Sequence, residues 1–172
     1  MLEKARTAYC REMARDVLKK SLFKEPPIDI KEILNIYGFE YLEVDTFPDK
    51  LDALFLTHEG KHYAAVNKKN HPNRKIFSLA HELGHKLMNH TLEYYKTEIT
   101  LDKPPDKYNH TQNEAIFEKE ANIFAGELLV PLKMLKIEYK KKPDIPELAK
   151  IFKVSEQVIS IRISDHMGVL CK

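Results

Sequence analysis

The chain contains a five-residue motif, His81-Glu82-Leu83-Gly84-His85, whose residue types and spacing suit metal-dependent hydrolysis. Residues four apart share one face of an α-helix at a separation of about 6 Å, so His81 and His85 can bind one metal ion. Glu82 lies about 100° round the helix, within reach of a water molecule on that metal. Such a motif on a helix is typical of zinc hydrolases that activate water against a peptide bond. In 172 residues with eight histidines, chance would produce the motif only about 0.04 times.

A catalytic zinc site normally takes a third protein ligand and keeps one position for water. The segment from 111 to 129 is predicted to form an apolar helix, and it carries Glu114, Glu118 and Glu120 as candidate ligands. Glu118 and Asn122 are four apart, so Glu118 can bind the metal while Asn122 orients a histidine ring from behind. Glu120 points about 160° away from Glu118, so only one of these two carboxylates can be the ligand.

Three β-like runs precede the motif and predict a small antiparallel sheet. They are Phe39 to Val44, Ala53 to Thr57 and His62 to Asn67. The residues from His58 to Lys61 have the character of a hairpin turn between the last two runs. The last run lies just before the motif helix, and it is a candidate for pairing with the backbone of a substrate as an added strand.

Helices are predicted both before and after these strands in the sequence. Gly38 is expected to end the second helix. They are expected from Leu2 to Phe23, from the cap Asp29 to Tyr37, from Pro72 through the motif, from Thr111 to Leu129, from Pro131 to Tyr139, from Pro146 to Phe152, and from Ser155 to His166 with a stop at Gly168. Residues 140–143 are expected to form a solvated linker. Gly84 inside the motif helix costs about 1 kcal/mol relative to alanine, which predicts that another backbone packs closely against that turn.

The composition limits the classes of protein that the chain can belong to. A net charge of +2 is too small to indicate nucleic-acid binding by itself. No apolar run approaches the roughly 20 residues that a membrane span needs, and residues 1–20 contain no apolar core of a secretory signal. Cys10 and Cys171 lie near opposite ends and predict free thiols in a reducing environment. These features favour one cytoplasmic domain, with at most a small appendage.

Two separate strings in the chain resemble the signatures of a known family. The string from Ile76 to His85 is similar to the motif helix of the ImmA/IrrE-type metallopeptidases. The string from Glu118 to Pro131 resembles that family's second signature, E-x-x-A-N/D-x-F-A-x-x-L-L-M-P, with Val130 in place of the usual methionine. The resemblance implies a zinc-dependent endopeptidase whose ligands are His81, His85 and the first glutamate of the second signature, which is Glu118 here.

The resulting prediction is an α+β fold, mostly helical and zincin-like, with a small antiparallel three-stranded sheet and a helical C-terminal tail. The metallopeptidase domain is expected at residues 1–139, and residues 140–172 are expected to form a tail similar to a helix-turn-helix, packed on the same domain. Glu82 is the expected general base and Zn²⁺ is the expected cofactor. Asn122 is expected to orient one of the metal-binding histidine rings. The resemblance implies a protein substrate, namely a DNA-binding repressor of a phage or mobile element.

Two other functions stay open on the sequence. One is a non-catalytic anti-repressor that binds and displaces the repressor, with zinc holding the fold. The other is a DNA-binding regulator that uses the tail, but the second tail helix has Arg162 as its only lysine or arginine, which makes nucleic acid an unfavoured partner. Five further side chains could stabilise a transition state near the motif, namely His90, Tyr94, Tyr95, Tyr108 and His110. A packing or surface role is favoured for each of them.

Overall fold

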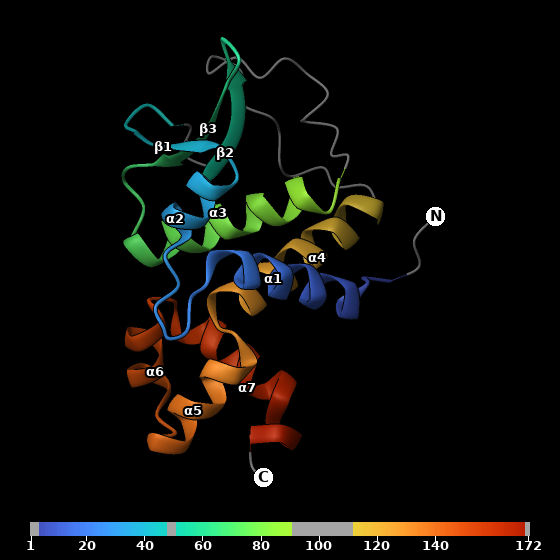
Figure 1. Cartoon of the computed structure of the whole chain (residues 1–172), viewed down its shortest axis with the longest axis vertical. Helices are drawn as coiled ribbons and strands as arrows, with labels where there is room; N and C mark the ends of the chain where they lie inside the picture. Colours follow the sequence, from blue (N-terminus) through green and yellow to red (C-terminus); the bar gives the residue numbers. More distant parts are fainter. Residues whose placement is uncertain (1–3, 48–50, 91–111, 171–172) are drawn as a thin grey trace.

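The computed structural model describes residues 4–47, 51–90 and 112–170. Within these ranges the elements follow in the order α1 (Thr7–Ser21), α2 (Ile30–Ile36), β1 (Phe39–Val44), β2 (Ala53–His58), β3 (Lys61–Asn67), α3 (Pro72–Leu87), α4 (Gln112–Leu129), α5 (Leu132–Lys141), α6 (Ile145–Phe152) and α7 (Glu156–Leu170). The sheet lies at one end of the molecule, α5 to α7 lie at the other, and α1, α3 and α4 cross the middle (Figure 1). This arrangement confirms the α+β class.

The sheet is mixed, so the prediction of a fully antiparallel sheet was wrong. Its strand order is β1-β3-β2, with β1 parallel to β3 and β2 antiparallel to β3. The predicted hairpin is present, because Glu59 and Gly60 both adopt a positive φ, of 49° and 77°, as a tight hairpin turn requires. β3 contains fully buried residues from Ala64 to Val66 and takes the central place. The alternation of apolar and polar residues shows which face of a strand is buried, but it does not show which strands pair with one another. The sequence therefore did not reveal the strand order.

The motif helix α3 packs beneath β2 and β3 and against α4. Gly84 lies at the crossing of the two helices, where a Cβ atom would stand 2.8 Å from Cδ1 of Phe124 on α4. A close neighbour at Gly84 is therefore confirmed, but it is a buried aromatic ring of α4 and not the backbone that the sequence predicted. This close approach places the side chains of α3 and α4 within reach of one another.

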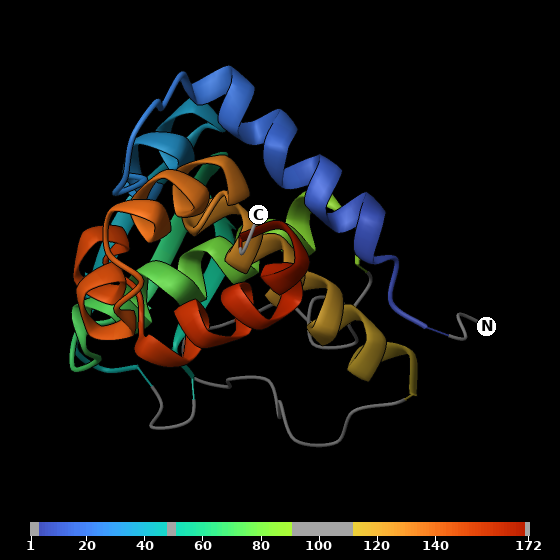
Figure 2. The same cartoon turned by 90° about the horizontal axis from the view of Figure 1, so that it is seen from below.

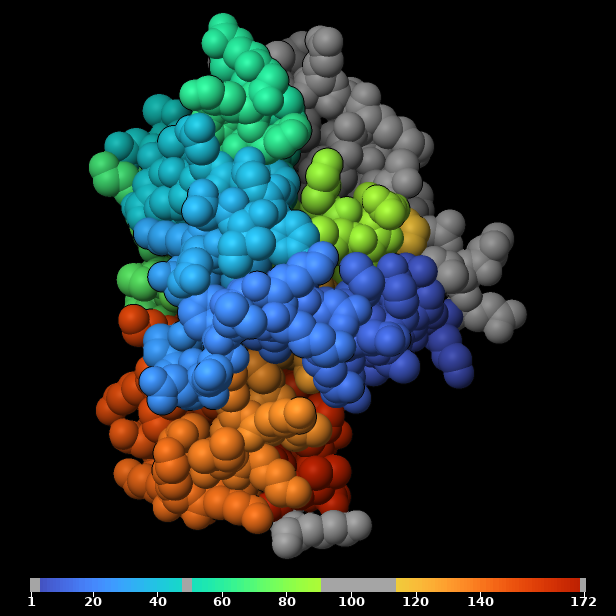
Figure 3. Space-filling view, in the orientation of Figure 1, coloured from blue at the N-terminus to red at the C-terminus, as the bar shows by residue number. Residues whose placement is uncertain are grey.

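Local signals set the ends of the first two helices. The carboxylate of Asp29 accepts hydrogen bonds from the backbone N–H groups of Lys31 and Glu32 and caps α2, as predicted. α1 begins at Thr7 instead of Leu2, and it ends where Leu22 adopts a left-handed conformation. In the space-filling view α1 forms a band across this face, between the sheet end and the end that holds α5 to α7 (Figure 3).

The C-terminal helices extend beyond the predicted ends. α5 continues to Lys141, into the segment predicted as a linker, and α7 passes through Gly168 to Leu170. Leu170 is 4% exposed, and the apolar surface that it buries offsets the cost of a helical glycine. Viewed from below, α5, α6 and α7 lie nearest the viewer (Figure 2).

None of the helices in the described residues is long and apolar enough to span a membrane. Several residues singled out from the sequence lie outside the described ranges, and they are Cys171, Tyr94, Tyr95, Tyr108 and His110.

Candidate metal centre

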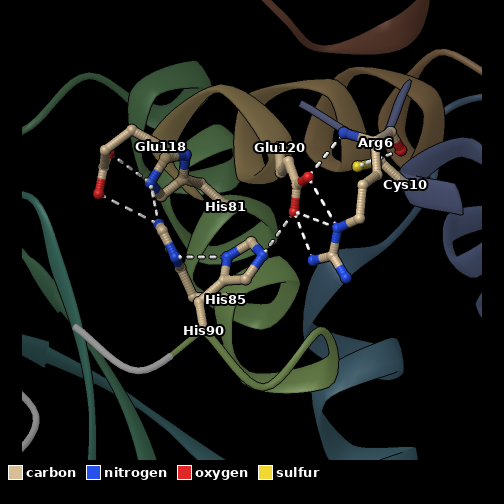
Figure 4. Close-up of polar contacts among 7 residues, drawn as sticks. All are labelled: Arg6, Cys10, His81, His85, His90, Glu118 and Glu120. Atoms are coloured by element: carbon tan, nitrogen blue, oxygen red, sulfur yellow. Dashed lines mark hydrogen bonds and ion pairs between the residues drawn. The ribbon is translucent and has the colours of Figure 1, made fainter. Parts of the chain in front are cut away.

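Three side chains from α3 and α4 converge at one point. The Nε2 atoms of His81 and His85 are 2.9 Å apart, and the carboxylate of Glu118 lies 3.1 Å from the first and 3.3 Å from the second. These donor atoms all lie within 4.8 Å of one another. Figure 4 shows the two rings rising from α3 toward Glu118. The helix spacing of the motif supplies the two histidines, and the packing at Gly84 supplies the carboxylate.

The donor set fits a divalent metal ion. Four ligands at about 2.0 to 2.1 Å around a tetrahedral zinc ion are about 3.3 Å from one another, and the distances between the three donor groups approach that value. Two imidazole nitrogens and one carboxylate also match the ligands of known catalytic zinc sites. His85 is completely buried, whereas Glu118 is 29% exposed, so the site is closed behind His85 and open beside Glu118. An open side is what a fourth, exchangeable ligand needs.

The far side of the His81 ring is held by α4. Its Nδ1 atom lies 3.0 Å from Oδ1 of Asn122, the residue that the sequence predicted for this position. The amide oxygen is an acceptor, so Nδ1 carries the proton and Nε2 presents a lone pair toward Glu118. The geometry at His81 is thus that of a histidine prepared to bind a metal.

The far side of the His85 ring meets His90 and Glu120, which the sequence suggested only in other roles, and through them Arg6, which the sequence did not suggest. Nδ1 of His85 lies 3.0 Å from Nδ1 of His90, and Nε2 of His90 lies 2.9 Å from the carboxylate of Glu120. Arg6 then binds Glu120 through its backbone N–H at 2.6 Å and through its guanidinium at 2.6 to 3.2 Å. His90 therefore lies behind His85, on the side away from the open part of the site. A residue in that position cannot contact a transition state.

The other carboxylates are placed differently from Glu118. Glu120 is fully buried against Arg6 and His90, so it is not the third member of the group. Glu114, the remaining candidate, is buried one turn earlier on α4 and also lies outside the group. Glu82 is 2% exposed on α3, between the two histidines in sequence. Of the three candidate ligands on α4, only Glu118 meets the histidines.

Comparison with known families gives the affiliation of the chain. Residues 41–164 match the sequence profile of a peptidase family described as the IrrE N-terminal-like domain. The chain belongs to this family. The match runs from within β1 to within α7, including both helices that carry the candidate metal centre, and it supports a metallopeptidase-like role. It also agrees with the resemblance that the two signature strings carried.

A second comparison concerns the fold. The IrrE-like chain is similar to a Mycobacterium tuberculosis transcriptional regulator, with a TM-score of 0.69 and 18% identity over 91% of this chain and 46% of the regulator. At that level of identity the likeness shows the fold alone, and the chain spans just under half of the regulator's length. A comparison with curated proteins found no match.

The electrostatics of the IrrE-like site favour a neutral histidine beside an ionised carboxylate. Burial lowers the pKa of His85, which keeps the ring neutral and its lone pair available. Burial would raise the pKa of Glu118, but the polar contacts with His81 and His85 outweigh this effect and lower it. The pKa of His90 falls to about 4, first through burial and then through the neighbouring His85. The charge states therefore suit a divalent cation.

Nothing in the sequence indicated Arg6, and His90 was suggested only as a candidate transition-state donor and not as the residue behind His85. A signal for His90 was present, because Asn89 tolerates the left-handed conformation that turns the chain back after a helix. Asn89 has a φ of 54° and the N–H of His90 donates to the carbonyl of His85 over 3.0 Å, which places the His90 ring behind His85. No local signal indicates Arg6, which lies 114 positions before its partner Glu120.

Proposed function

We propose that the protein is a zinc-dependent endopeptidase that hydrolyses a peptide bond within a protein substrate. The observation that carries this proposal is the convergence of His81, His85 and Glu118, with Glu82 on the same helix. Membership in a peptidase family supports the same reaction class. The choice of zinc follows from the two imidazoles and one carboxylate, which form a ligand set characteristic of catalytic zinc.

Each residue has a distinct part in the proposed reaction. His81, His85 and Glu118 hold the metal, and the single negative charge of Glu118 leaves a net positive site. Zinc held by these residues would supply Lewis acidity, which would lower the pKa of a water molecule toward about 7 and polarise the scissile carbonyl. The carboxylate of Glu82 accepts the proton of the attacking water and delivers it to the nitrogen of the leaving amine as the C–N bond breaks. Asn122 keeps the ring of His81 oriented throughout.

The sheet limits where an extended substrate can add a strand. The sequence suggested β3, but β3 is the central strand and pairs with both β1 and β2. Its backbone donors and acceptors are therefore already used, and that suggestion was wrong. Within the described residues, a free edge remains only on β1 and β2. We propose that an extended segment of the substrate pairs at one of these edges.

The proposed substrate is a DNA-binding repressor. Support comes from the resemblance to the ImmA/IrrE-type peptidases and from the fold shared with a protein named as a transcriptional regulator. The repressor would be cut by the protease, which relieves repression. Incubation of the purified protein with candidate repressors, followed by mass spectrometry of the fragments, identifies the substrate and the bond.

The substitution Glu82→Gln tests the proposed chemistry. The variant should keep its fold and about one zinc ion per chain, because Glu82 is not a ligand, and it should lose cleavage and derepression. Glu25→Gln, which removes an exposed carboxylate in the segment between α1 and α2, is the control and should cleave normally. Derepression that survives in Glu82→Gln would overturn the peptidase proposal in favour of a non-catalytic anti-repressor.

The structure gives little support to the reading in which α7 binds DNA. Arg162 is 3% exposed and donates to the carboxylate of Glu127 and to the carbonyl of Val130. It is thus directed into the protein, where it cannot reach a phosphate. A gel-shift titration with increasing salt tests this directly, since phosphate contacts would give a steep loss of binding with salt.

A further inference from the structure

A chain of polar side chains leads from His85 through the interior to the start of α1. It consists of His85, His90, Glu120 and Arg6, which come from three separate segments of the sequence (Figure 4). The contacts are 3.0, 2.9 and 2.6 Å long. The side chains of His90 and Glu120 are 1% and 0% exposed, so each depends on the other members for its hydrogen bonds.

The chemistry of the last member determines the direction of every hydrogen bond in this chain. Arg6 can only donate, so the carboxylate of Glu120 is an ionised acceptor. Nε2 of His90 must then donate to Glu120, which leaves Nδ1 of His90 without a proton in the neutral ring. Nδ1 of His85 must therefore donate to His90, and the lone pair of His85 is left on Nε2, the atom that faces His81 and Glu118.

We propose that His90, Glu120 and Arg6 are positioning residues that hold His85 in the tautomer and orientation that bind the metal. The inference rests on the proposed function in one respect, which is that His85 is a metal ligand. It extends that function by making the beginning of α1 part of the support of the metal centre. Hydrogen bonds behind ligating histidines fix the ring and strengthen its basicity, and their loss typically weakens metal binding by about 10- to 100-fold.

The surrounding packing makes this chain rigid. The ring of His90 stacks on Phe117 of α4, with the ring centres 4.5 Å apart and the planes inclined by 15°. Glu120 also accepts the backbone N–H of Arg6, the residue directly before α1, and so joins the first turn of α1 to α4. A histidine stacked on one face and held at both nitrogens has little freedom to rotate, and the same constraint is passed to His85.

The tautomers can be read from the wild-type protein. Long-range ¹H–¹⁵N NMR spectra of the zinc-loaded protein should show a proton on Nδ1 of His85 and a proton on Nε2 of His90. The opposite tautomer at His90 would overturn the proposal, because Nδ1 of His85 would then lack an acceptor. This measurement needs no variant, so it decides the matter even where a substitution prevents folding.

The substitution His90→Phe tests the effect on the metal. Phenylalanine keeps a ring that can stack on Phe117 but removes both nitrogens, so the zinc dissociation constant should rise about 10- to 100-fold in competition with a chromophoric chelator. His62→Phe is the matched control, since His62 is an exposed histidine on β3. It should bind zinc as the wild type does, and His90→Phe binding zinc equally tightly would refute the inference.

A double substitution separates positioning from a general loss of structure. Glu120→Gln should weaken zinc binding in the wild-type background and have little further effect in His90→Phe, because the connection to His85 is already broken. Independent, additive effects would contradict a shared chain. Zinc affinity does not depend on cleavage, so an inactive wild type whose His90→Phe variant binds zinc weakly would refute the proposed function and leave this inference standing.

Discussion

Replacing Gly84 with alanine should destabilise the protein, although alanine normally favours a helix interior. A Cβ atom at this position would lie 2.8, 3.1 and 3.3 Å from Cδ1, Cγ and Cβ of Phe124. Phe124 is fully buried, so its ring has no free space into which it can move. The two helices must then separate by a few tenths of an ångström, or the ring must leave its preferred rotamer.

Two opposing effects set the magnitude. Exchanging glycine for alanine in a helix gains about 1 kcal/mol, whereas overpacking a tight core costs about 1 to 3 kcal/mol. The net loss in the free energy of unfolding is therefore about 0 to 2 kcal/mol. Gly168 in α7 provides the matched control, because a Cβ atom there meets nothing within 4 Å. Gly168→Ala should stabilise by about 0.5 to 1 kcal/mol, so the two variants should differ by about 0.5 to 3 kcal/mol.

Urea unfolding of both variants without metal, followed by circular dichroism, measures this difference. Zinc affinity gives a second readout, since separation of α3 from α4 lengthens the distances of 3.1 and 3.3 Å between the histidines and Glu118. An equal gain in stability for Gly84→Ala and Gly168→Ala would refute the reasoning. It would mean that the close approach at Gly84 does not hold the two helices in place.

Three further predictions follow from the charged groups. Glu118→Ala should lose bound zinc in elemental analysis, whereas Glu120→Ala should still reach one zinc ion per chain at saturating metal, and the reverse result would exchange their roles. Arg162→Met should destabilise the protein in urea unfolding, because the buried carboxylate of Glu127 then keeps only the half-exposed Arg15 as its partner, and the loss should stay below the roughly 3 to 5 kcal/mol of a fully unpaired buried charge. Burial raises the pKa of Glu120, but the hydrogen bonds from Arg6 lower it to about 2 from its ordinary 4.5. Its ionised form thus stabilises the fold fully above pH 4.5, and this contribution is lost as the pH falls toward 2. The free energy of unfolding of Glu120→Gln should accordingly change less steeply across that range than that of the wild type.

Features that depend on neighbouring residues could be predicted from the sequence. The spacing of His81 and His85 places both rings on one face of a helix. Asp29 caps the helix that follows it, and Glu59-Gly60 forms the hairpin turn. Each of these depends on contacts within a few positions along the chain, where the backbone geometry of a helix or turn leaves few alternatives. The use of zinc, the endopeptidase activity and the repressor substrate stay proposals, because neither the residue types nor the fold identifies the metal or the substrate.

Features that depend on distant residues were decided by the tertiary structure. The order of the strands follows from the burial of β3, which no alternation pattern reveals. Helical geometry allowed either Glu118 or Glu120 as the third ligand, and only the packing of α4 on Gly84 turned Glu118 toward the histidines. The chain behind His85 joins positions that are 30 and 114 residues apart. Such contacts form because burial forces each polar group to find a partner in three dimensions, and the linear sequence does not say which partner comes within reach.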